Sequence, residues 1–296
     1  MPHDVTTTAP TPTHFHADAV TGEVCRLAPN LTRIVAPNPS PLTGPGTNTY
    51  VLGAEGGRTL VIDPGPDDAL HLERILGVSA GRIDAVLCTH SHSDHSPGAA
   101  ALQARTGAVV RGRPAPRDDY QDEHYAPDAT IDDGEVFVVP GASLRALHTP
   151  GHASNHVCFL LEPEGWLFTG DHLMNGSTVV ILPPDGSMRL YLESLQRLRT
   201  LPLTALVPGH GAVMPGAVAE IDRVIAHRLA REQKVVDALR RQSSAVALDA
   251  LVREVYHDTP VALHGLARFS LLAHLQKLGE EGRALEKGER WRWHGP

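Results

Sequence analysis

Short runs of β-branched and other apolar residues, separated by Gly and Pro, recur along the first two thirds of the chain. Runs of this length and composition are typical of buried strands. The predicted strands cover residues 31–36, 49–52, 59–63, 85–89, 108–111, 136–139, 144–148, 157–161, 166–169, 179–182 and 205–207. Helices are predicted at residues 67–76, 97–105 and 189–199. Many strands with a few interspersed helices indicate two packed sheets with helices outside them.

The pattern changes near residue 215, where apolar residues begin to recur at helical spacing. Val218, Ile221 and Ile225 start this series, so residues 217–241 are predicted to form one long helix. Helices at residues 248–256 and 266–278 and a short hairpin at residues 282–293 are predicted to follow it. Helix, helix and hairpin together are the outline of a winged helix.

These patterns divide the chain into three segments. Residues 1–30, rich in Thr, Pro and His, are interpreted as a flexible lead-in. Residues 31–216 are predicted to form a catalytic domain, and residues 217–296 the long helix with a small winged-helix-like domain. With 296 residues, of which 42% are hydrophobic, the chain is long enough to bury a sizeable core. This composition excludes a disordered, collagenous or coiled-coil protein.

Several features predict a cytoplasmic protein that does not enter the membrane. No apolar run approaches the roughly 18 residues that a membrane-spanning helix needs. The N-terminal segment has neither a lysine nor an arginine before Arg26, and it lacks the apolar stretch of a secretory signal. The three cysteines, Cys25, Cys88 and Cys158, lie far apart and are odd in number, which is not the pattern of a disulfide framework. A reducing compartment fits this usage.

The net charge of −8 is unevenly distributed along the chain. Residues 1–216 contain 23 acidic residues, 13 arginines and no lysine, whereas residues 217–296 contain 13 basic and 11 acidic residues. The segment 117–133 carries seven acidic residues against one arginine, and it would repel polyanions if it borders a site. Because nucleic-acid-binding proteins usually have a clearly basic face, a small substrate of low charge fits this chain better.

The densest chemical feature is the segment Thr89-His90-Ser91-His92-Ser93-Asp94-His95, directly after the predicted strand 85–89. Imidazole and carboxylate are natural ligands of zinc and neighbouring first-row metals. In an extended loop His90 and His92 point to the same side. A turn after them would carry Asp94 and His95 toward a second position, so this one segment is able to supply two metal positions.

Three more candidate ligands, His152, Asp171 and His210, each follow a predicted strand in a turn that contains Gly. Turns at strand ends commonly assemble a site along one edge of a sheet. The ordered set His-x-His-x-Asp-His, Gly-His, Gly-Asp and Gly-His is much more specific than any single one of the 18 histidines. The sequence therefore predicts a metal site.

The complete set resembles the dinuclear ligand pattern of the metallo-β-lactamase superfamily at every position. The resemblance implies an α+β fold, a four-layer αββα sandwich, here with a small C-terminal winged-helix domain. It assigns three ligands to each of two metal ions and one ligand to both: His90, His92 and His152 to the first ion, Asp94, His95 and His210 to the second, and Asp171 as the bridge. It also implies that Asp63, in the segment Leu60-Val61-Ile62-Asp63-Pro64-Gly65, supports the ligand loop from behind.

Softer features resemble one branch of this superfamily, that of β-lactamase-like protein 2. They are the segments Gly46-Thr47-Asn48-Thr49-Tyr50, Thr149-Pro150-Gly151-His152 and His227-Arg228-Leu229-Ala230-Arg231-Glu232-Gln233, together with the winged-helix outline. This resemblance covers roughly residues 30–290. Members of the branch include ribonucleases that act on single-stranded RNA, and related fungal enzymes hydrolyse thioesters.

The chemistry expected of such a site is hydrolysis. Two divalent ions, with zinc expected and manganese or iron as alternatives, would share a bridging hydroxide that attacks a carbonyl carbon or phosphorus. Asp94 is the catalytic candidate, because it would orient this hydroxide or take its proton. We therefore predict a metallohydrolase of a small ester, thioester or lactone. An antibiotic-degrading lactamase is not expected, since the chain shows no export signal and no lysine before Lys234.

Two alternatives involve nucleic acid. An endoribonuclease would bind the phosphates of single-stranded RNA with the basic residues of the long helix: Arg223, Arg228, Arg231, Lys234, Arg240 and Arg241. The same residues are equally typical of a helix face that is exposed to solvent. A nucleic-acid-binding regulator with a vestigial metal domain is less favoured, since all seven ligands are present and its recognition helix has few basic residues: Arg268, His274 and Lys277.

Residues in segments beside the ligand turns are expected near the metals: Asn48, His156, His172 and Tyr191. The C-terminal unit is expected either to cap the active-site mouth or to mediate homodimerisation.

Overall fold

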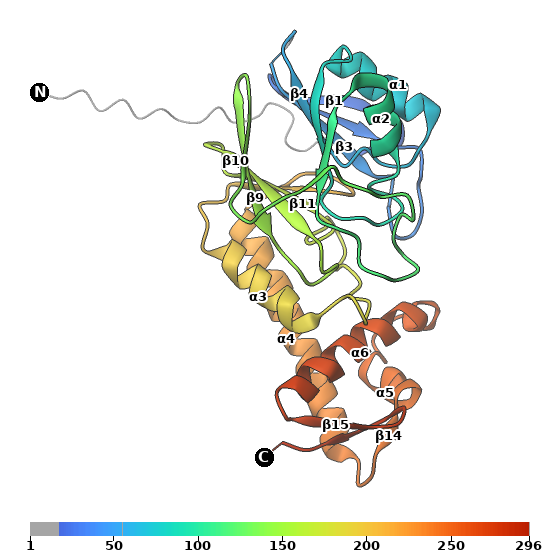
Figure 1. Cartoon of the computed structure of the whole chain (residues 1–296). Coiled ribbons are helices and arrows are strands. Elements are labelled where there is room, and N and C mark those ends of the chain that lie inside the picture. Colours follow the sequence, from blue (N-terminus) through green and yellow to red (C-terminus); the bar gives the residue numbers. More distant parts are fainter. Residues whose placement is uncertain (1–17, 55, 296) are drawn as a thin grey trace, which may run out of the picture.

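Two large sheets form the centre of the molecule, which is known from a computed structural model that describes residues 18–54 and 56–295 (Figure 1). The first sheet has seven strands in sequence order: β1 (Val24–Ala28), β2 (Leu31–Val35), β3 (Asn48–Leu52), β4 (Thr59–Ile62), β5 (Ile83–Leu87), β6 (Val109–Gly112) and β7 (Ala129–Thr130). The second sheet has six strands in reverse order: β13 (Met214–Pro215), β12 (Ala205–Pro208), β11 (Trp166–Gly170), β10 (Val157–Glu162), β9 (Ala142–His148) and β8 (Val136–Val139).

Strand direction determines where the ends of these strands meet. Strands β4, β5, β6 and β7 run parallel to one another, so β4 and β5 end at the same edge of the first sheet. In the second sheet β9 and β11 both pair antiparallel with β10, and β12 runs parallel to β11. The C-terminal ends of β9, β11 and β12 therefore share one edge as well.

Apolar residues fill three layers around the two sheets. Side chains such as Leu52, Leu87 and Phe159 form the core between the sheets. Helices α1 (Ala69–Ser79) and α2 (Gly98–Thr106) cover the outer face of the first sheet, and α3 (Met188–Arg199) with the first part of α4 (Ala217–Arg241) covers the second. The expected αββα sandwich is confirmed.

The C-terminal unit has a core of its own, which includes Leu239, Leu271 and Trp291. Its elements are β14 (Val246–Ala247), α5 (Leu248–Val255), the 3-10 turn η1 (Val261–Leu263), α6 (His264–Glu280), β15 (Ala284–Lys287) and β16 (Arg290–Trp293). The helix–helix–hairpin outline of a winged helix is confirmed. No helix in the described part of the chain is both long and apolar enough to cross a membrane.

Helix α4 belongs to both units, as its course in Figure 1 shows. Its 25 residues span about 37 Å at the usual helical rise. Ile221 and Val224 pack into the core behind the second sheet, whereas Val235 and Leu239 pack into the C-terminal core. Helix α6 also contacts the sandwich, because Ala273 lies in the same core as Ile221. The long helix thus packs into the cores of both units and connects them.

Two expectations differ from the structure. Residues 179–182, predicted to be a strand, have no regular structure. The carbonyl groups of Val179 and Val180 instead accept side-chain hydrogen bonds from Arg228 and His152. Strand β1 lies within the lead-in expected at residues 1–30 and pairs with β2, so the ordered chain begins earlier than predicted. Residues 1–17 of that lead-in are outside the described residues.

Candidate metal centre

The seven predicted ligands lie together where the ends of the two sheets meet. Four come from the loop between β5 and α2, and the others follow β9, β11 and β12: His90, His92, Asp94 and His95, then His152, Asp171 and His210. Backbone hydrogen bonds join the loops across the sheets, from Asn48 N to Gly209 O and from Val157 N to Thr89 O, each at 2.7 Å. These bonds fix the distance between loops that are far apart in sequence.

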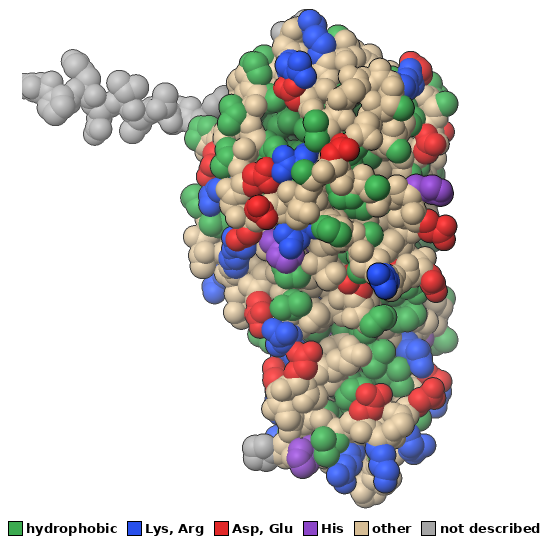
Figure 2. All heavy atoms as spheres, in the orientation of Figure 1, with side chains coloured by type: hydrophobic (Ala, Val, Ile, Leu, Met, Phe, Trp, Pro, Cys, Tyr) green, Lys and Arg blue, Asp and Glu red, His purple; other side chains and the backbone are tan. Residues whose placement is uncertain are grey.

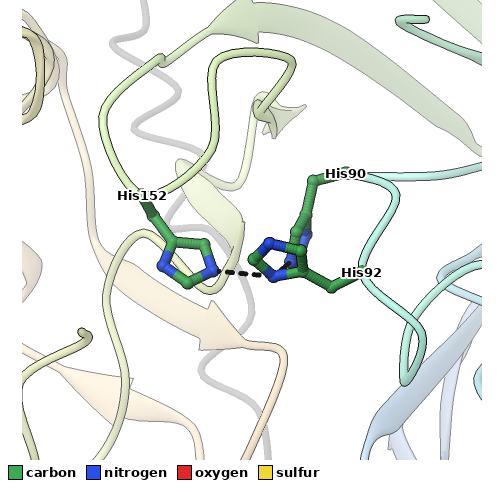
Figure 3. Close-up of side chains that lie close together, drawn as sticks. All are labelled: His90, His92 and His152. Carbon is green, nitrogen blue, oxygen red and sulfur yellow. Dashed lines mark hydrogen bonds between the residues drawn. The ribbon is translucent and has the colours of Figure 1, made fainter. Parts of the chain in front are cut away.

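The ligand atoms form one continuous cluster. Within each of three groups, one ligand atom per residue lies within 4.8 Å of the others: His90, His92 and His152; Asp94, His95 and His210; and His90, His95 and Asp171. Figure 3 shows His90 and His92 on one loop, with His152 pointing toward them from another. The third group connects the first two. The assignment of each residue to a particular ion stays a prediction.

Hydrogen bonds behind His90 and His152 determine which of their nitrogens carries a proton. The hydroxyl of Thr89 donates to Asp63 Oδ2 at 2.8 Å, so it accepts from His90 Nδ1 at 3.0 Å. Nδ1 of His152 donates to the carbonyl of Val180 at 2.9 Å. Because a neutral imidazole has only one N–H, the neutral form of each ring has its lone pair on Nε2.

These two lone pairs converge on the third histidine of the group. Nδ1 of His92 lies 2.9 Å from Nε2 of His90 and 3.1 Å from Nε2 of His152. A neutral His92 has at most one proton to donate, so at least one facing nitrogen is left without a donor. Converging imidazole lone pairs are the arrangement by which proteins bind zinc and related cations.

His95 and His210 are oriented in the same way. Nδ1 of His95 donates to Asp63 Oδ2 at 2.9 Å, and Nδ1 of His210 donates to the carbonyl of Gly46 at 3.2 Å. Their Nε2 atoms face Asp171 Oδ1, at 3.3 Å from His95 and 3.2 Å from His210. Metal-binding histidines usually have their second nitrogen held by a carboxylate or a backbone carbonyl.

The second group also has a carboxylate at its outer side. Oδ2 of Asp94 lies 3.3 Å from His210 Nε2 and 3.5 Å from His95 Nε2. His95 Nε2 and Asp171 Oδ1 are buried, yet neither has a hydrogen-bond partner among the residues that the structure describes. Buried polar atoms without partners are rare in folded proteins, and a bound ion would satisfy both. The donor set therefore fits a dinuclear metal site.

The two groups differ in their electrostatics. Burial and the neighbouring imidazoles lower the pKa of His90 well below its usual value and that of His92 to about 3. Burial also acts to lower the pKa of His95 and His210, but the carboxylates of Asp94 and Asp171 outweigh it. They raise the pKa of His95 well above its usual value and that of His210 to about 9. Without metal, His90 and His92 are neutral at pH 7, whereas His95 and His210 carry protons.

The comparisons with known proteins agree with this geometry. A profile of the metallo-beta-lactamase superfamily matches residues 42–210, more than half of the chain. The chain belongs to the metallo-beta-lactamase superfamily. A profile of the beta-lactamase associated winged helix domain matches residues 247–293. The resemblance inferred from the ligand motifs is confirmed.

Named relatives of this metallo-beta-lactamase superfamily member include proteins of two kinds. A beta-lactamase-like protein 2 homolog from Caenorhabditis elegans is 31% identical over 266 residues, which cover 87% of this chain and 86% of the relative. An atrochrysone carboxyl ACP thioesterase from Aspergillus fumigatus is 36% identical over 224 residues, 74% of this chain and 67% of the relative. A metallo-beta-lactamase family protein from Thermus thermophilus has the same fold, with a TM-score of 0.73 at 24% identity over 91% of this chain and 100% of that chain.

The four further residues that were expected near the metals of this metallo-beta-lactamase fold lie beside the predicted ligands: Asn48, His156, His172 and Tyr191. Nδ2 of Asn48 donates to the carbonyls of Pro208 and Gly211, which flank His210. The ring of His156 lies 5.1 Å from that of His90 and 5.7 Å from that of His172. Tyr191 donates to the carbonyl of His172 at 2.8 Å. Their contacts support the ligand turns.

The acidic segment 117–133 borders the metal centre. His92 forms an isolated β-bridge with Gln121, and the backbone N–H of Asp122 donates to the carbonyl of Ser91 at 2.7 Å. The carboxylate of Asp122 accepts a hydrogen bond from Ser96 at 3.0 Å. The ligand loop is thus held on one side by a strongly acidic segment. The sequence left open whether this segment borders the site, and the structure shows that it does.

Some residues that shape the centre were missed from the sequence. Thr89 links Asp63 to His90, and its only signal was its position at the end of the predicted strand. At Gly209 a Cβ would lie 2.8 Å from His95 Cε1 and 3.0 Å from Asp171 Oδ1. The sequence shows glycines in the ligand turns, but the reason for this one is a close approach between loops.

Proposed function

We propose that this metallo-beta-lactamase superfamily member is a dinuclear metal-dependent hydrolase of a small ester, thioester or lactone. The observation that carries the proposal is that His95 Nε2 and Asp171 Oδ1 are buried beside further converging ligand atoms and have no hydrogen-bond partner in the described part of the chain. Bound divalent ions, with zinc expected and manganese or iron as alternatives, would supply Lewis acidity and lower the pKa of coordinated water. Similarity to proteins named as atrochrysone carboxyl ACP thioesterases supports a thioester among these substrates.

The ligand groups correspond to two ions. His90, His92 and His152 would hold one ion, Asp94, His95 and His210 the other, and Asp171 would contact both. Asp94 is the proton acceptor in this proposal. Its side chain is 28% exposed, against 13% for Asp171, so a proton taken up at Asp94 is able to pass to solvent.

The surface around the long helix gives little support to the RNA alternative. Most of the six basic residues of α4 are already engaged: Arg223 with Glu220, Arg231 and Lys234 with Asp258, Arg241 with Glu254, and Arg228 in the protein interior. RNA affinity depends chiefly on neutralising phosphates, and a phosphate track would have to break these pairs. Figure 2 shows acidic and basic side chains interspersed over the visible face.

The winged-helix domain likewise lacks the basic helix of a regulator. In α6, His274 is fully buried, and Lys277 donates to Glu232 at 2.9 Å and to Glu281 at 2.6 Å. Arg268, the remaining basic candidate, pairs with Asp249. These contacts favour a structural role for α6 and an enzymatic role for the chain.

We also propose a cytoplasmic location. The three cysteines are free thiols, and Cys88 and Cys158 are buried, as expected in a reducing compartment. Homodimerisation through the C-terminal unit, or capping of the active-site mouth by it, stays a prediction.

The deciding experiment compares substrates with zinc-replete protein. Wild type, Asp171→Ala and the exposed-site control Asp67→Ala are assayed on an acyl thioester, the matched oxygen ester, a lactone and end-labelled single-stranded RNA. We expect turnover of an ester-type substrate by wild type and Asp67→Ala, and loss of both turnover and metal in Asp171→Ala. RNA cleavage by wild type but not by Asp171→Ala would assign the chain to the ribonucleases. Full activity of Asp171→Ala with one metal ion or none would overturn the metal mechanism.

A further inference from the structure

A buried arginine on α4 lies close to the metal centre. Arg228 is 3% exposed and, among the residues that the structure describes, forms no ion pair with a carboxylate. Its guanidinium donates to the carbonyl of Val179 and lies over the ring of Tyr191, 5.3 Å from the ring centroid. Burying a charge away from water and counter-ions is unfavourable, so its contacts must stabilise something in the folded state.

The first contact leads to His152. Val179 and Val180 lie in a segment without regular structure, so no strand ladder fixes their carbonyl groups. The carbonyl of Val180 accepts the Nδ1 proton of His152 and thereby turns Nε2 toward His92. By holding Val179, Arg228 fixes the neighbouring carbonyl on which the orientation of His152 depends.

The second contact of Arg228, with the ring of Tyr191, connects it to the turn of His152 and to the turn of Asp171. Tyr191 is 1% exposed, and its hydroxyl donates to the carbonyl of His172, the residue that follows Asp171. The backbone of Tyr191 also packs against Gly151, where a Cβ would lie only 2.3 Å from Tyr191 Cα. One guanidinium therefore supports two ligand-bearing turns, through a carbonyl on one side and an aromatic ring on the other.

We propose that Arg228 is a positioning residue of the metal centre, which acts through Val180 on His152 and through Tyr191 on the turn of Asp171. The helix that leads into the winged-helix domain would then be part of the support of the metal site. The proposal rests on the proposed function only in that the cluster binds metal, and it does not depend on the substrate.

Helix α4 offers a matched control. Arg231, three residues further on, also donates to a backbone carbonyl, that of Val255 at 2.8 Å, and lies over a tyrosine ring, that of Tyr256 at 4.3 Å. These contacts are within the C-terminal unit, away from the ligand turns. The variants Arg228→Met and Arg231→Met keep most of the apolar stem and remove a carbonyl contact and a ring contact at two places. Arg231→Met also removes the ion pair with Asp258, so it is the more disruptive of the two changes within the C-terminal unit.

The test measures zinc affinity at both sites by competition with a chromogenic chelator, in wild type and the two variants. We expect Arg228→Met to weaken one of the two sites by about 10–100-fold, as loss of an outer partner of a metal ligand typically does. Arg231→Met is expected to leave both affinities within about twofold of wild type. In a His152→Ala background, Arg228→Met is expected to cause a smaller loss than in wild type, because the route through Val180 to His152 is then absent and only the route through Tyr191 remains.

Three results would overturn the proposal: unchanged affinities in Arg228→Met, equal losses in Arg231→Met, or full additivity with His152→Ala. If Arg228→Met does not fold, Arg228→Lys and Arg231→Lys replace the pair. A weaker site in Arg228→Lys alone supports the proposal, and equal affinities overturn it. Wild type that binds two ions but hydrolyses nothing would contradict the proposed function and leave this inference standing, whereas wild type that binds no metal would contradict both.

Discussion

Asp63 accepts a hydrogen bond from Nδ1 of His95 at 2.9 Å and thereby directs Nε2 of that imidazole toward the ligand cluster. The same carboxylate accepts the backbone N–H of Thr89 at 2.7 Å and its hydroxyl at 2.8 Å. Through Thr89 it also orients His90. One buried side chain outside the ligand set thus fixes ligands of both predicted metal positions.

Asp63→Asn tests this arrangement. An amide is unable to accept from all three donors that surround Asp63, so at least one of them loses its partner. Asn tolerates the left-handed backbone at this position, where φ is +49°, so the fold is expected to persist. We expect about 10–100-fold weaker zinc binding, with a matching loss of turnover.

The control for that variant is Asp68→Asn. Asp68 caps α1 by accepting the N–H of His71 at 2.8 Å, and Asn caps a helix equally well. Zinc titration of both variants should separate them clearly. Equal affinities in Asp63→Asn and Asp68→Asn would show that Asp63 does not orient the ligands.

The pH dependence of metal binding should differ between the two ligand groups. Binding at His95 and His210 must displace protons, because Asp94 and Asp171 raise the pKa of both imidazoles against the effect of burial, that of His210 to about 9. The affinity of that group should therefore rise up to about pH 9, by about tenfold per pH unit for each proton displaced. His90 and His92, whose pKa values lie far below 7, should add no pH dependence to metal binding near neutrality.

Calorimetry in buffers of different ionisation enthalpy would count these protons. The event at His95 and His210 is expected to release more protons at pH 7 than the event at His90 and His92. Two ions that bind with the same proton release would contradict the difference between the groups.

His71 should make the fold less stable as the pH falls. It is fully buried, its Nε2 lies 2.8 Å from Thr49 Oγ1, and its Nδ1 has no hydrogen-bond partner within residues 18–54 and 56–295. Burial therefore lowers its pKa from 6.5 to about 4. Because the folded-state pKa lies below the unfolded value, its contribution is complete above pH 6.5 and is lost as the pH falls toward 4.

Denaturant unfolding of the metal-free protein checks this sign. From about pH 7.5 to about pH 5.5, wild type should lose about 1.3 kcal/mol more free energy of unfolding than His71→Gln, which has no titrating group there. The comparison between variants removes the contribution of His95 and His210, which is common to both. Parallel pH profiles would contradict the assignment to His71.

The clustering of the seven predicted ligands could be predicted because it depends on local order along the chain. His90, His152 and His210 each follow an apolar run, and the ends of such runs meet when the runs become neighbouring strands of a sandwich. The predicted helix at residues 217–241 was also found with the same bounds, since its apolar spacing is long and regular.

What holds the ligands was not predictable, because it depends on contacts between distant segments. Val180 and Arg228 are 48 positions apart, and both act on His152 through a loop that the sequence presented as a strand. Val179 and Ile181 of that loop are buried, so the pattern resembles a strand, but the carbonyl groups of Val179 and Val180 accept hydrogen bonds from side chains. The periodicity of apolar residues indicates which side chains are buried. It does not indicate which donor a backbone carbonyl group will bind.

Gly151→Ala should displace His152 without unfolding the chain. A Cβ at Gly151 would lie 2.3 Å from Cα and 2.6 Å from the backbone nitrogen of Tyr191, and backbone atoms at the start of α3 have little room to move. The backbone of Gly151 also has a φ of +146°, which disfavours any other residue. Relief of the clash must shift the turn relative to α3, so we expect loss of the ion bound by His152 and at least tenfold lower turnover.

Gly107→Ala separates the steric effect from backbone strain. Gly107 ends α2 with a φ of +73°, but a Cβ there would have no neighbour within 4 Å. It should cost about 1 kcal/mol of stability and leave zinc stoichiometry unchanged. Metal analysis after dialysis against a weak chelator would distinguish the two variants, with two ions retained by Gly107→Ala and one by Gly151→Ala. Two ions in both would mean that the Gly151 turn adapts to the added methyl group, and that the approach of Tyr191 does not fix the position of His152.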